Sequence, residues 1–124
     1  MKIIRIINAK EIFAPHFQEK LSPALSYKIY KLCKCAEQEE EFYNQKMREI
    51  ITEYAERDEN GGFININGQI KLVEATAPEA QQKVADLRAV DIEAPNVKFT
   101  LDELSEIKLS VQDIAAIDEF IEEV

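Results

Sequence analysis

The chain has 124 residues, which is the size of one domain and long enough to bury a hydrophobic core. Hydrophobic residues make up 46% of it, a fraction that excludes a wholly disordered chain, and only three glycines and four prolines exclude collagen-like classes. The net charge is -9, from 15 basic and 24 acidic residues. This excess of acid disfavours binding to nucleic acid or to an anionic membrane, because both are themselves negatively charged.

The charge is unevenly distributed along the chain. Residues 1–36 contain seven basic and two acidic residues, whereas residues 37–124 contain eight basic and 22 acidic residues. The sequence shows no signal-peptide pattern and no apolar run of the ~18 residues that a membrane span needs. Cys33 and Cys35 would lie on nearly opposite faces of a helix, so we expect two reduced thiols rather than a disulfide. These features predict a cytoplasmic protein.

Two elements are predicted before residue 22. Residues 1–7 are rich in β-branched isoleucine and predict a short N-terminal strand. Asn8 is a suitable N-cap for a helix over residues 9–20. Pro15 predicts a kink in that helix, or a break before it.

The longest predicted element is a helix of about 35 residues over positions 23–57, with Ser22 as its N-cap. Such a helix is about 52 Å long, whereas a compact domain of this size is only about 35 Å across. Either the helix breaks near the acidic block at residues 37–41, or the molecule is elongated, or a partner covers one end. Because the block contains no helix breaker, we favour a continuous helix in one elongated domain spanning residues 1–124.

A β-hairpin is predicted near residues 63–73. Asn67-Gly68 joins two β-rich runs, and both residue types tolerate the positive φ of a type I′ turn. This turn would place Asn65 opposite Ile70 and Phe63 opposite Leu72.

Short helices are predicted in the remainder of the chain. One would begin at Pro78 and run to about residue 89. Residues 100–103 have the form of a capping box, and Ser110 would cap a last helix with an apolar face. That face would consist of Ile114, Ile117, Phe120 and Ile121. The predicted fold class is therefore α+β and mostly helical.

The sequence offers no recognisable catalytic, metal or cofactor site. His16 has no nucleophile motif around it, and the glycines form no phosphate-binding loop. Asp58 and Asn60 invite comparison with a calcium loop, but Phe63 and Gln69 fall where such a loop needs glycine and glutamate. We therefore expect no enzyme activity, no cofactor and no bound metal.

Two groups of residues indicate interactions. The first is a basic patch with Tyr27 and Tyr30 among its lysines, which favours pairing with the acidic C-terminal half over nucleic-acid binding. Its lysines are Lys20, Lys28, Lys31 and Lys34. The second is an apolar band on the second half of the long helix, which is either core or a surface for a partner. The band consists of Phe42, Tyr43, Met47, Ile50, Ile51 and Tyr54.

Three segments carry a resemblance to known proteins: residues 21–32, which open a Glu-rich long helix, the Asp-Glu-Asn-Gly turn at 58–61, and the ending at 109–122. Their order resembles an uncharacterised family of small phage and prophage proteins from Gram-positive bacteria. The resemblance implies a phage-encoded, non-enzymatic protein in a bacterial host, and it supplies no catalytic residue. Pro15 and the two cysteines depart from the family's features.

These observations lead to two functional hypotheses. The first is a phage-derived protein that acts in assembly or host takeover through its long helix, by binding another protein or a second copy as a homodimer. The alternative is an acidic inhibitor that imitates nucleic acid, because the charge of residues 37–124 could fill a basic cleft. Binding by mimicry should collapse in high salt, whereas apolar docking should persist.

Overall fold

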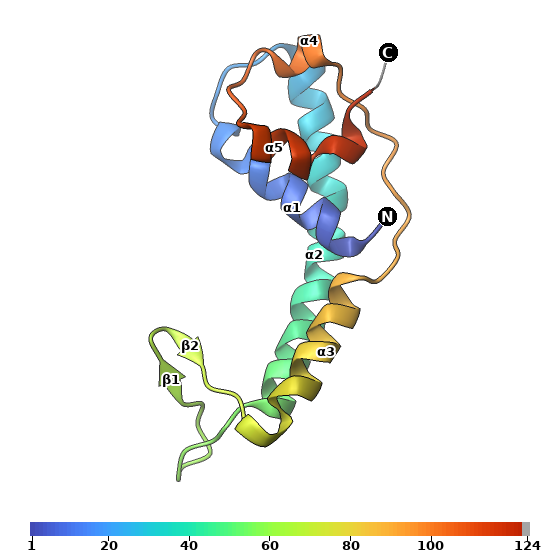
Figure 1. Ribbon diagram of the computed structural model, residues 1–124. Helices are drawn as coiled ribbons and strands as arrows, with labels where there is room; N and C mark the ends of the chain where they lie inside the picture. The colour runs from blue at the N-terminus through green and yellow to red at the C-terminus, as the bar shows by residue number, and fades with distance from the viewer. Residues whose placement is uncertain (123–124) are drawn as a thin grey trace. The chain divides into compact units, whose positions relative to one another are not determined.

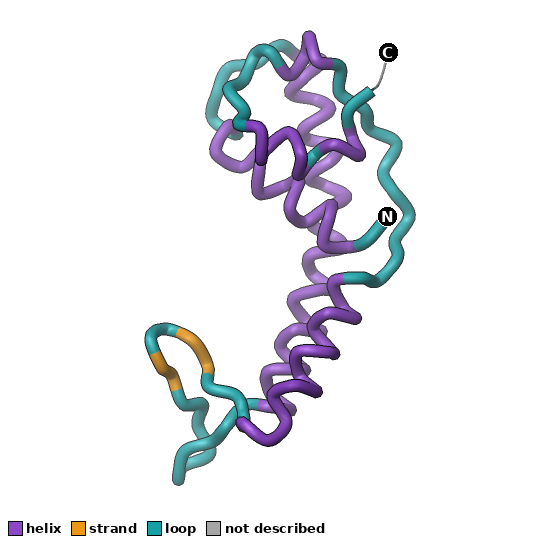
Figure 2. The backbone as a smooth tube through the Cα atoms, viewed as in Figure 1, coloured by secondary structure: helices purple, strands orange, loops and turns teal. Residues whose placement is uncertain are grey.

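The computed structural model describes residues 1–122 and shows a mostly helical chain (Figures 1 and 2). In chain order the elements are α1 (Ile3–Phe13), the 3-10 turn η1 (Ala14–His16), α2 (Pro23–Tyr54), β1 (Asn65–Ile66), β2 (Gln69–Ile70), η2 (Glu74–Thr76), α3 (Ala77–Arg88), α4 (Leu101–Leu104), α5 (Val111–Ala116) and η3 (Asp118–Phe120). The chain forms two compact units. Unit 1 contains Met1–Glu40 and the segment from Asp91 onward, and unit 2 contains Glu41–Val90.

The predicted N-terminal strand over residues 1–7 is wrong, because α1 begins at Ile3 and Asn8 lies inside it rather than capping it. Only the first two residues pair in an extended form, through the carbonyl of Met1 and a bridge between Lys2 and Asp91. The isoleucines prefer strands by local propensity, but they also recur at helical spacing and are buried on one face. Burial of that face outweighs the propensity. The break before Pro15 is confirmed, since α1 ends at Phe13 and η1 follows.

The long helix is confirmed as a single element of 32 residues that continues through the acidic block at 37–41. Ser22 caps it as predicted, because its hydroxyl accepts a hydrogen bond from the Leu25 amide at 3.4 Å. The helix ends at Tyr54 rather than near residue 57. The residues after Tyr54 pair with the segment that follows β2. The Glu56 amide donates to the Lys71 carbonyl, and Ala55 forms a bridge with Leu72.

The predicted hairpin is confirmed, with β1 and β2 antiparallel and Asn65 opposite Ile70. Asn67 and Gly68 have φ angles of 53° and 81°, the positive values that a type I′ turn requires. The ladder between the strands is only two residues long. Phe63 and Leu72 are not its next pair, because each is bridged instead to the segment after α2.

The predicted short helices are confirmed, with changes at their ends. α3 begins at Ala77 and ends at Arg88, close to the predicted bounds. Reciprocal capping boxes begin α4 at Thr100 and α5 at Ser110. The last helix is shorter than expected, because α5 ends at Ala116 and Ile121 forms a parallel bridge with Phe99.

The core of unit 1 is formed where α1 and the first half of α2 meet the C-terminal segment. α1 packs against α5, and the rings of Phe13 and Phe99 lie 5.1 Å apart. Sixteen of the twenty buried hydrophobic residues in the described chain belong to this unit. Its largest fully buried side chains are Phe13, Phe99, Phe120, Ile3, Ile6, Leu25, Leu32 and Ile117.

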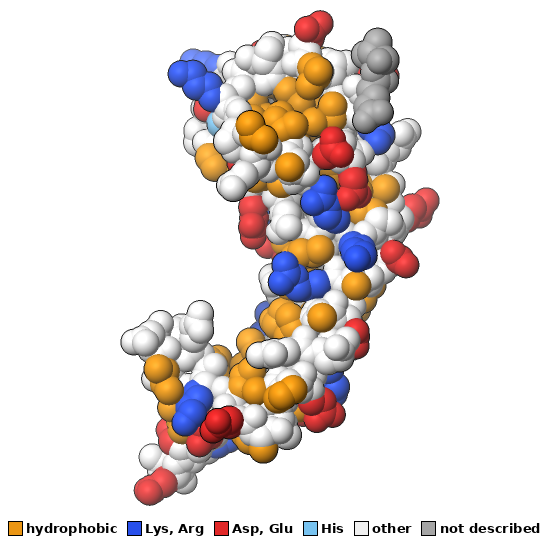
Figure 3. Space-filling view, in the orientation of Figure 1, with side chains coloured by type: hydrophobic (Ala, Val, Ile, Leu, Met, Phe, Trp, Pro, Cys, Tyr) orange, Lys and Arg blue, Asp and Glu red, His pale blue; other side chains and the backbone are white. Residues whose placement is uncertain are grey.

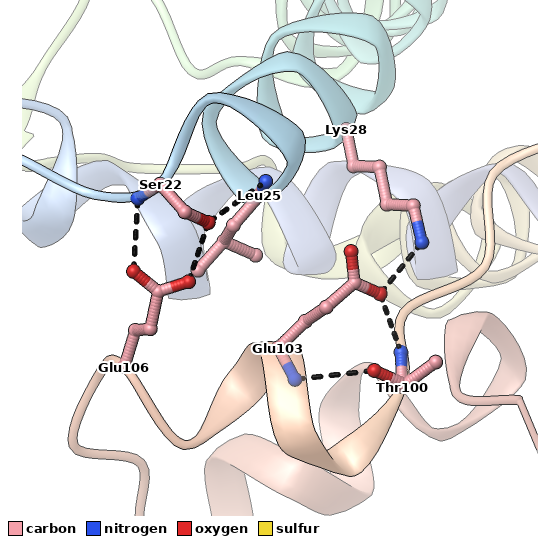
Figure 4. A network of polar contacts seen from close by, with 6 residues as sticks. All are labelled: Ser22, Leu25, Lys28, Thr100, Glu103 and Glu106. Carbon is pink, nitrogen blue, oxygen red and sulfur yellow. Dashed lines mark hydrogen bonds and ion pairs between the residues drawn. The ribbon is translucent and has the colours of Figure 1, made fainter.

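Polar contacts join the start of α2 to α4 within unit 1 (Figure 4). Lys28 Nζ donates to Glu103 Oε1 at 2.6 Å, and the same carboxylate accepts from the Thr100 amide at 2.9 Å. The Glu106 carboxylate accepts two hydrogen bonds from Ser22, one from the backbone amide of Ser22 and one from the Ser22 hydroxyl. The predicted pairing of basic N-terminal residues with acidic C-terminal ones is therefore present for Lys28, and also for Arg5, which pairs with Glu119.

We expect Glu103→Gln to lower the free energy of unfolding by about 1 kcal/mol at pH 7, since the pair is partly exposed. The hydrogen bond from Lys28, followed by that from Thr100, lowers the pKa of Glu103 below its ordinary value of 4.5. Stability that depends on a lowered carboxyl pKa is present above the unfolded pKa and lost as the pH falls through the folded one. The difference in unfolding free energy between wild type and variant should therefore shrink as the pH is lowered toward about 3, which is below the ordinary pKa of a glutamate side chain.

Urea unfolding at neutral and acid pH measures this difference. Glu93→Gln is the matched control, because Glu93 is exposed and forms no ion pair among residues 1–122. A difference that is unchanged or larger in acid would contradict the assigned role of Glu103.

Candidate functional site

The predicted apolar band lies in unit 2, where the structure covers its members to different extents. Tyr54 is 5% exposed and belongs to the small core of the unit. Tyr43, Met47, Ile50 and Ile51 are half-buried, and Phe42 is 42% exposed. The band is therefore neither a complete core nor a free surface. Its covering is partial along most of its length.

α3 covers one side of the band, running beside the second half of α2 (Figures 1 and 2). Ala80 and Leu87 are the buried residues of α3. Lys83 joins the two helices at the surface, since its ammonium lies 3.3 Å from Glu53 and 5.1 Å from the centroid of the Tyr54 ring. The hydrogen bond with Tyr54, followed by that with Glu53, raises the pKa of Lys83. The contact of Lys83 with Glu53 and Tyr54 therefore lies between α2 and α3 at the surface, next to an opening between the two helices.

That opening is a groove of about 370 Å³ between α2 and α3. Its apolar lining comes from Phe42 and Ile50 on α2, together with Leu87 and Val90 at the end of α3. Charged side chains of both signs surround this lining, namely Lys46, Glu49, Glu53, Lys83 and Asp86. Figure 3 shows the same mixture on unit 2, where hydrophobic surface alternates with both kinds of charge. Apolar grooves with charged rims are typical of surfaces that bind an amphipathic helix.

The end of unit 2 carries the hairpin and the turn before it. Asp58 Oδ1 accepts hydrogen bonds from the amides of Asn60 and Gly62, both at 2.9 Å. This carboxylate therefore organises a turn, which gives Asp58 a structural role where a calcium loop was considered. Arg57 lies 4.1 Å from the centroid of the Phe63 ring, and Ile66 at the hairpin tip is half exposed.

Unit 2 as a whole buries few side chains. Only Tyr54, Ala55, Ala80 and Leu87 are buried in its 50 residues. Below about 70 residues a core rarely supplies more than 3–5 kcal/mol, so the packing within unit 2 contributes modestly to stability.

The predicted basic patch lies in unit 1, and its four lysines have different environments. Lys28 is paired with Glu103, as described above. The ammonium groups of Lys31 and Lys34 lie 5.8 and 5.9 Å from the ring centroids of Tyr27 and Tyr30. Lys20 is exposed. Across residues 1–122, Lys20, Lys31 and Lys34 take part in none of the ion pairs.

A cavity of about 270 Å³ in unit 1 brings together residues that the sequence did not connect. His16 and Phe17 contribute from the segment after α1, and Tyr30, Cys33 and Glu37 contribute from α2. His16 Nδ1 lies 2.8 Å from Glu19 Oε1. Burial raises the pKa of the Cys33 thiol to about 11, so this cysteine is a thiol at neutral pH. In the described part of the chain, no three His, Cys, Asp or Glu side chains are placed to hold a metal ion.

Other contributing residues were missed because they come from distant parts of the sequence. Asn96 and Lys98 line a cavity of about 400 Å³ with Tyr27, Lys28 and Lys31 of α2. Nothing in the local pattern of residues 90–99 indicates this contact. Long-range proximity of this kind needs the fold.

Comparisons with known proteins add no identification: no family model matches the chain, and neither a characterised protein nor a solved structure is significantly similar to it.

None of the helices within residues 1–122 has both the length and the hydrophobicity that crossing a lipid bilayer requires.

We expect the two cysteines to react with a thiol reagent at different rates. Cys35 is half-buried, whereas Cys33 is buried and has the raised pKa, so Cys35 should be labelled first. Labelling with an aromatic disulfide at neutral pH measures the rates, and Cys35→Ser assigns them. In that variant the fast phase should disappear and the slow phase should persist. Equal rates for both thiols would contradict the burial of Cys33.

Proposed function

We propose that this protein is a non-enzymatic interaction protein that binds another protein through the half-covered band of unit 2. The observation that carries the proposal is the burial of only four residues in that unit, beside a groove lined by Phe42, Ile50, Leu87 and Val90. Fully burying an exposed apolar side chain contributes roughly 1.5–3 kcal/mol. Among the four lining residues Phe42, at 42% exposed, has the most surface left to bury, whereas Leu87 is already buried.

A helix is the partner element that the groove suits best. Residues of both α2 and the end of α3 line the groove, and a third helix packed against the two would complete a small bundle. Charges of both signs around the groove would pair with a partner that also carries both signs. A second copy of this chain meets both requirements, because each copy would offer the same mixed rim in a two-fold symmetric contact.

The resemblance to small phage and prophage proteins supports a role in phage assembly or in takeover of a bacterial host. Neither role requires catalysis. Both involve contacts between proteins, which agrees with a groove rather than with a site of reactive groups. The setting proposed for these contacts is the cytoplasm of the host.

Mimicry of nucleic acid is the alternative, favoured by the acidic excess of residues 37–124. Within unit 2, however, the rim of the groove alternates Lys46 and Lys83 with its carboxylates. A phosphate-like surface would instead present one sign of charge. Binding that persists at about 1 M salt, where the screening length is ~3 Å, would favour the apolar groove over mimicry.

We expect Phe42→Glu to prevent self-association while leaving the helix content unchanged, because Phe42 is largely exposed and Glu is a good helix former. Gel filtration coupled to light scattering at ~100 μM measures the association, a concentration at which a dimer of micromolar Kd is largely formed. Gln45→Glu is the matched control, since Gln45 is exposed on the same helix turn and the substitution adds the same negative charge.

Circular dichroism and thermal unfolding of the three proteins complete the test. A dimer for wild type and Gln45→Glu, with a folded monomer for Phe42→Glu, is the expected result. A monomeric wild type would remove self-association. Loss of cooperative unfolding in Phe42→Glu would identify the band as ordinary core and contradict the proposal.

A further inference from the structure

The outward face of the first half of α2 carries two exposed tyrosines and two lysines at helical spacing. Tyr27, Tyr30, Lys31 and Lys34 are separated by three, one and three residues, so they lie along one stripe of the helix. Tyr27 is 58% exposed and Tyr30 is 60% exposed, and their ring centroids are 6.3 Å apart. The stripe lies opposite Leu25, Leu32 and Ala36, which face the core of unit 1.

The two sides of this stripe differ in chemistry. The 400 Å³ cavity on one side is lined by Tyr27 and by three lysines, Lys28, Lys31 and Lys98, with no carboxylate among its lining residues. The 270 Å³ cavity on the other side includes Phe17, Ile29 and Tyr30, and its lining also contains the carboxylates Glu19 and Glu37. The exposed rings are therefore flanked by a basic side and by a side that combines apolar residues with two carboxylates, so phosphates are expected on the basic side only.

Among these lysines, Lys31 and Lys34 have no carboxylate partner in residues 1–122, whereas Lys28 is held by Glu103. Lys98 donates to the backbone carbonyl of Glu119 at 2.6 Å. An anionic ligand at the stripe would thus meet ammonium groups that are not already neutralised. This local surplus of positive charge stands on a chain whose net charge is -9.

We propose that this stripe binds single-stranded nucleic acid, with bases stacked on Tyr27 and Tyr30 and phosphates on Lys31 and Lys34. Proteins that bind single strands combine a positively charged path for the backbone with aromatic side chains on which unpaired bases stack. Double-stranded nucleic acid fits less well, because its bases are already stacked on each other. An acidic peptide fits less well, because it offers the lysines charge but gives the two rings no flat group to stack on.

The net negative charge of the chain repels the phosphates of a nucleic acid, and this repulsion opposes binding at the stripe. Binding is therefore weak, and it is strongest at low salt. Each phosphate contact to a single strand contributes about 0.7 to the slope of log affinity against log salt. Two contacts, from Lys31 and Lys34, give a slope of about -1.4.

Fluorescence anisotropy of a labelled oligothymidine of about 12 nucleotides, titrated with the full chain, tests the proposal, because single-strand sites span about 4–16 nucleotides. The titration is made at about 20 mM and about 150 mM salt, since the salt slope separates phosphate contacts from stacking. One variant is Tyr27→Ala with Tyr30→Ala, and the other is Lys31→Gln with Lys34→Gln. The matched control is Lys71→Gln, since Lys71 is an exposed lysine of unit 2 that is paired with Glu56 and belongs neither to the stripe nor to the groove lining.

We expect the tyrosine variant to bind about five-fold more weakly or worse, and the lysine variant to lose most of the salt slope. Lys71→Gln should leave the affinity and the salt slope unchanged, and circular dichroism should show that all variants are folded. Absence of binding at low salt overturns the proposal. An equal loss in Lys71→Gln or equal affinity for the matching duplex also overturns it. Equal competition by a polyglutamate peptide would overturn it too, because it would identify an acidic protein segment as the ligand.

Discussion

Burial of the apolar face of the first half of α2 is the interaction on which unit 1 depends. Leu25, Leu32 and Ala36 are completely buried there, in the unit that contains both the N-terminal and the C-terminal segments. Because α1 and the C-terminal segment pack around this face, the two ends of the sequence meet in one core. Lys10 of α1 adds an ion pair to Glu40 at 3.0 Å, and Glu40 is one of the two half-buried members of the acidic block, with Glu39.

The second half of the same helix is packed differently, and this difference carries the functional account. In unit 2, α2 meets α3 and a two-stranded hairpin, and these enclose one large aromatic side chain, Tyr54, and one leucine. Two helices present too few faces to surround each other's apolar stripes, so Phe42 and Ile50 line an open groove. One helix thus contributes to a core in its first half and lines an open groove in its second.

Sequence reasoning succeeded where the signal was local. Ser22, Thr100 and Ser110 were predicted as caps from their positions relative to apolar runs, and Asn67-Gly68 was predicted as a turn from the φ angles that these residues tolerate. It failed for residues 1–7. The β-branched side chains there favour a strand, but the same isoleucines also recur at helical spacing, and in α1 this spacing places Ile3, Ile6 and Ile7 in the core. Propensity and burial conflicted there, and burial decided the outcome.

The candidate surfaces were predictable only in part. Helical spacing identified the apolar band and the lysine patch, because periodicity is a property of the sequence itself. How far each residue is covered depends on elements that are distant in the chain. α3 reduces the exposure of the band, Glu103 neutralises Lys28, and Lys98 joins the lysines from a segment with no helical pattern. Contacts of this kind arise from the fold and leave no mark on local residue patterns.

Hydrogen exchange of the α2 amides tests the central claim, that the two halves of this helix are covered to different extents. Amides at 25–36 should exchange slowly and at a rate independent of protein concentration, because unit 1 buries that face within one chain. Amides at 43–54 should exchange faster in dilute protein and slow down at ~100 μM or with a bound partner, because covering the groove stabilises them. Equal and concentration-independent protection of both segments in dilute protein would contradict the account, since unit 2 would then be complete by itself.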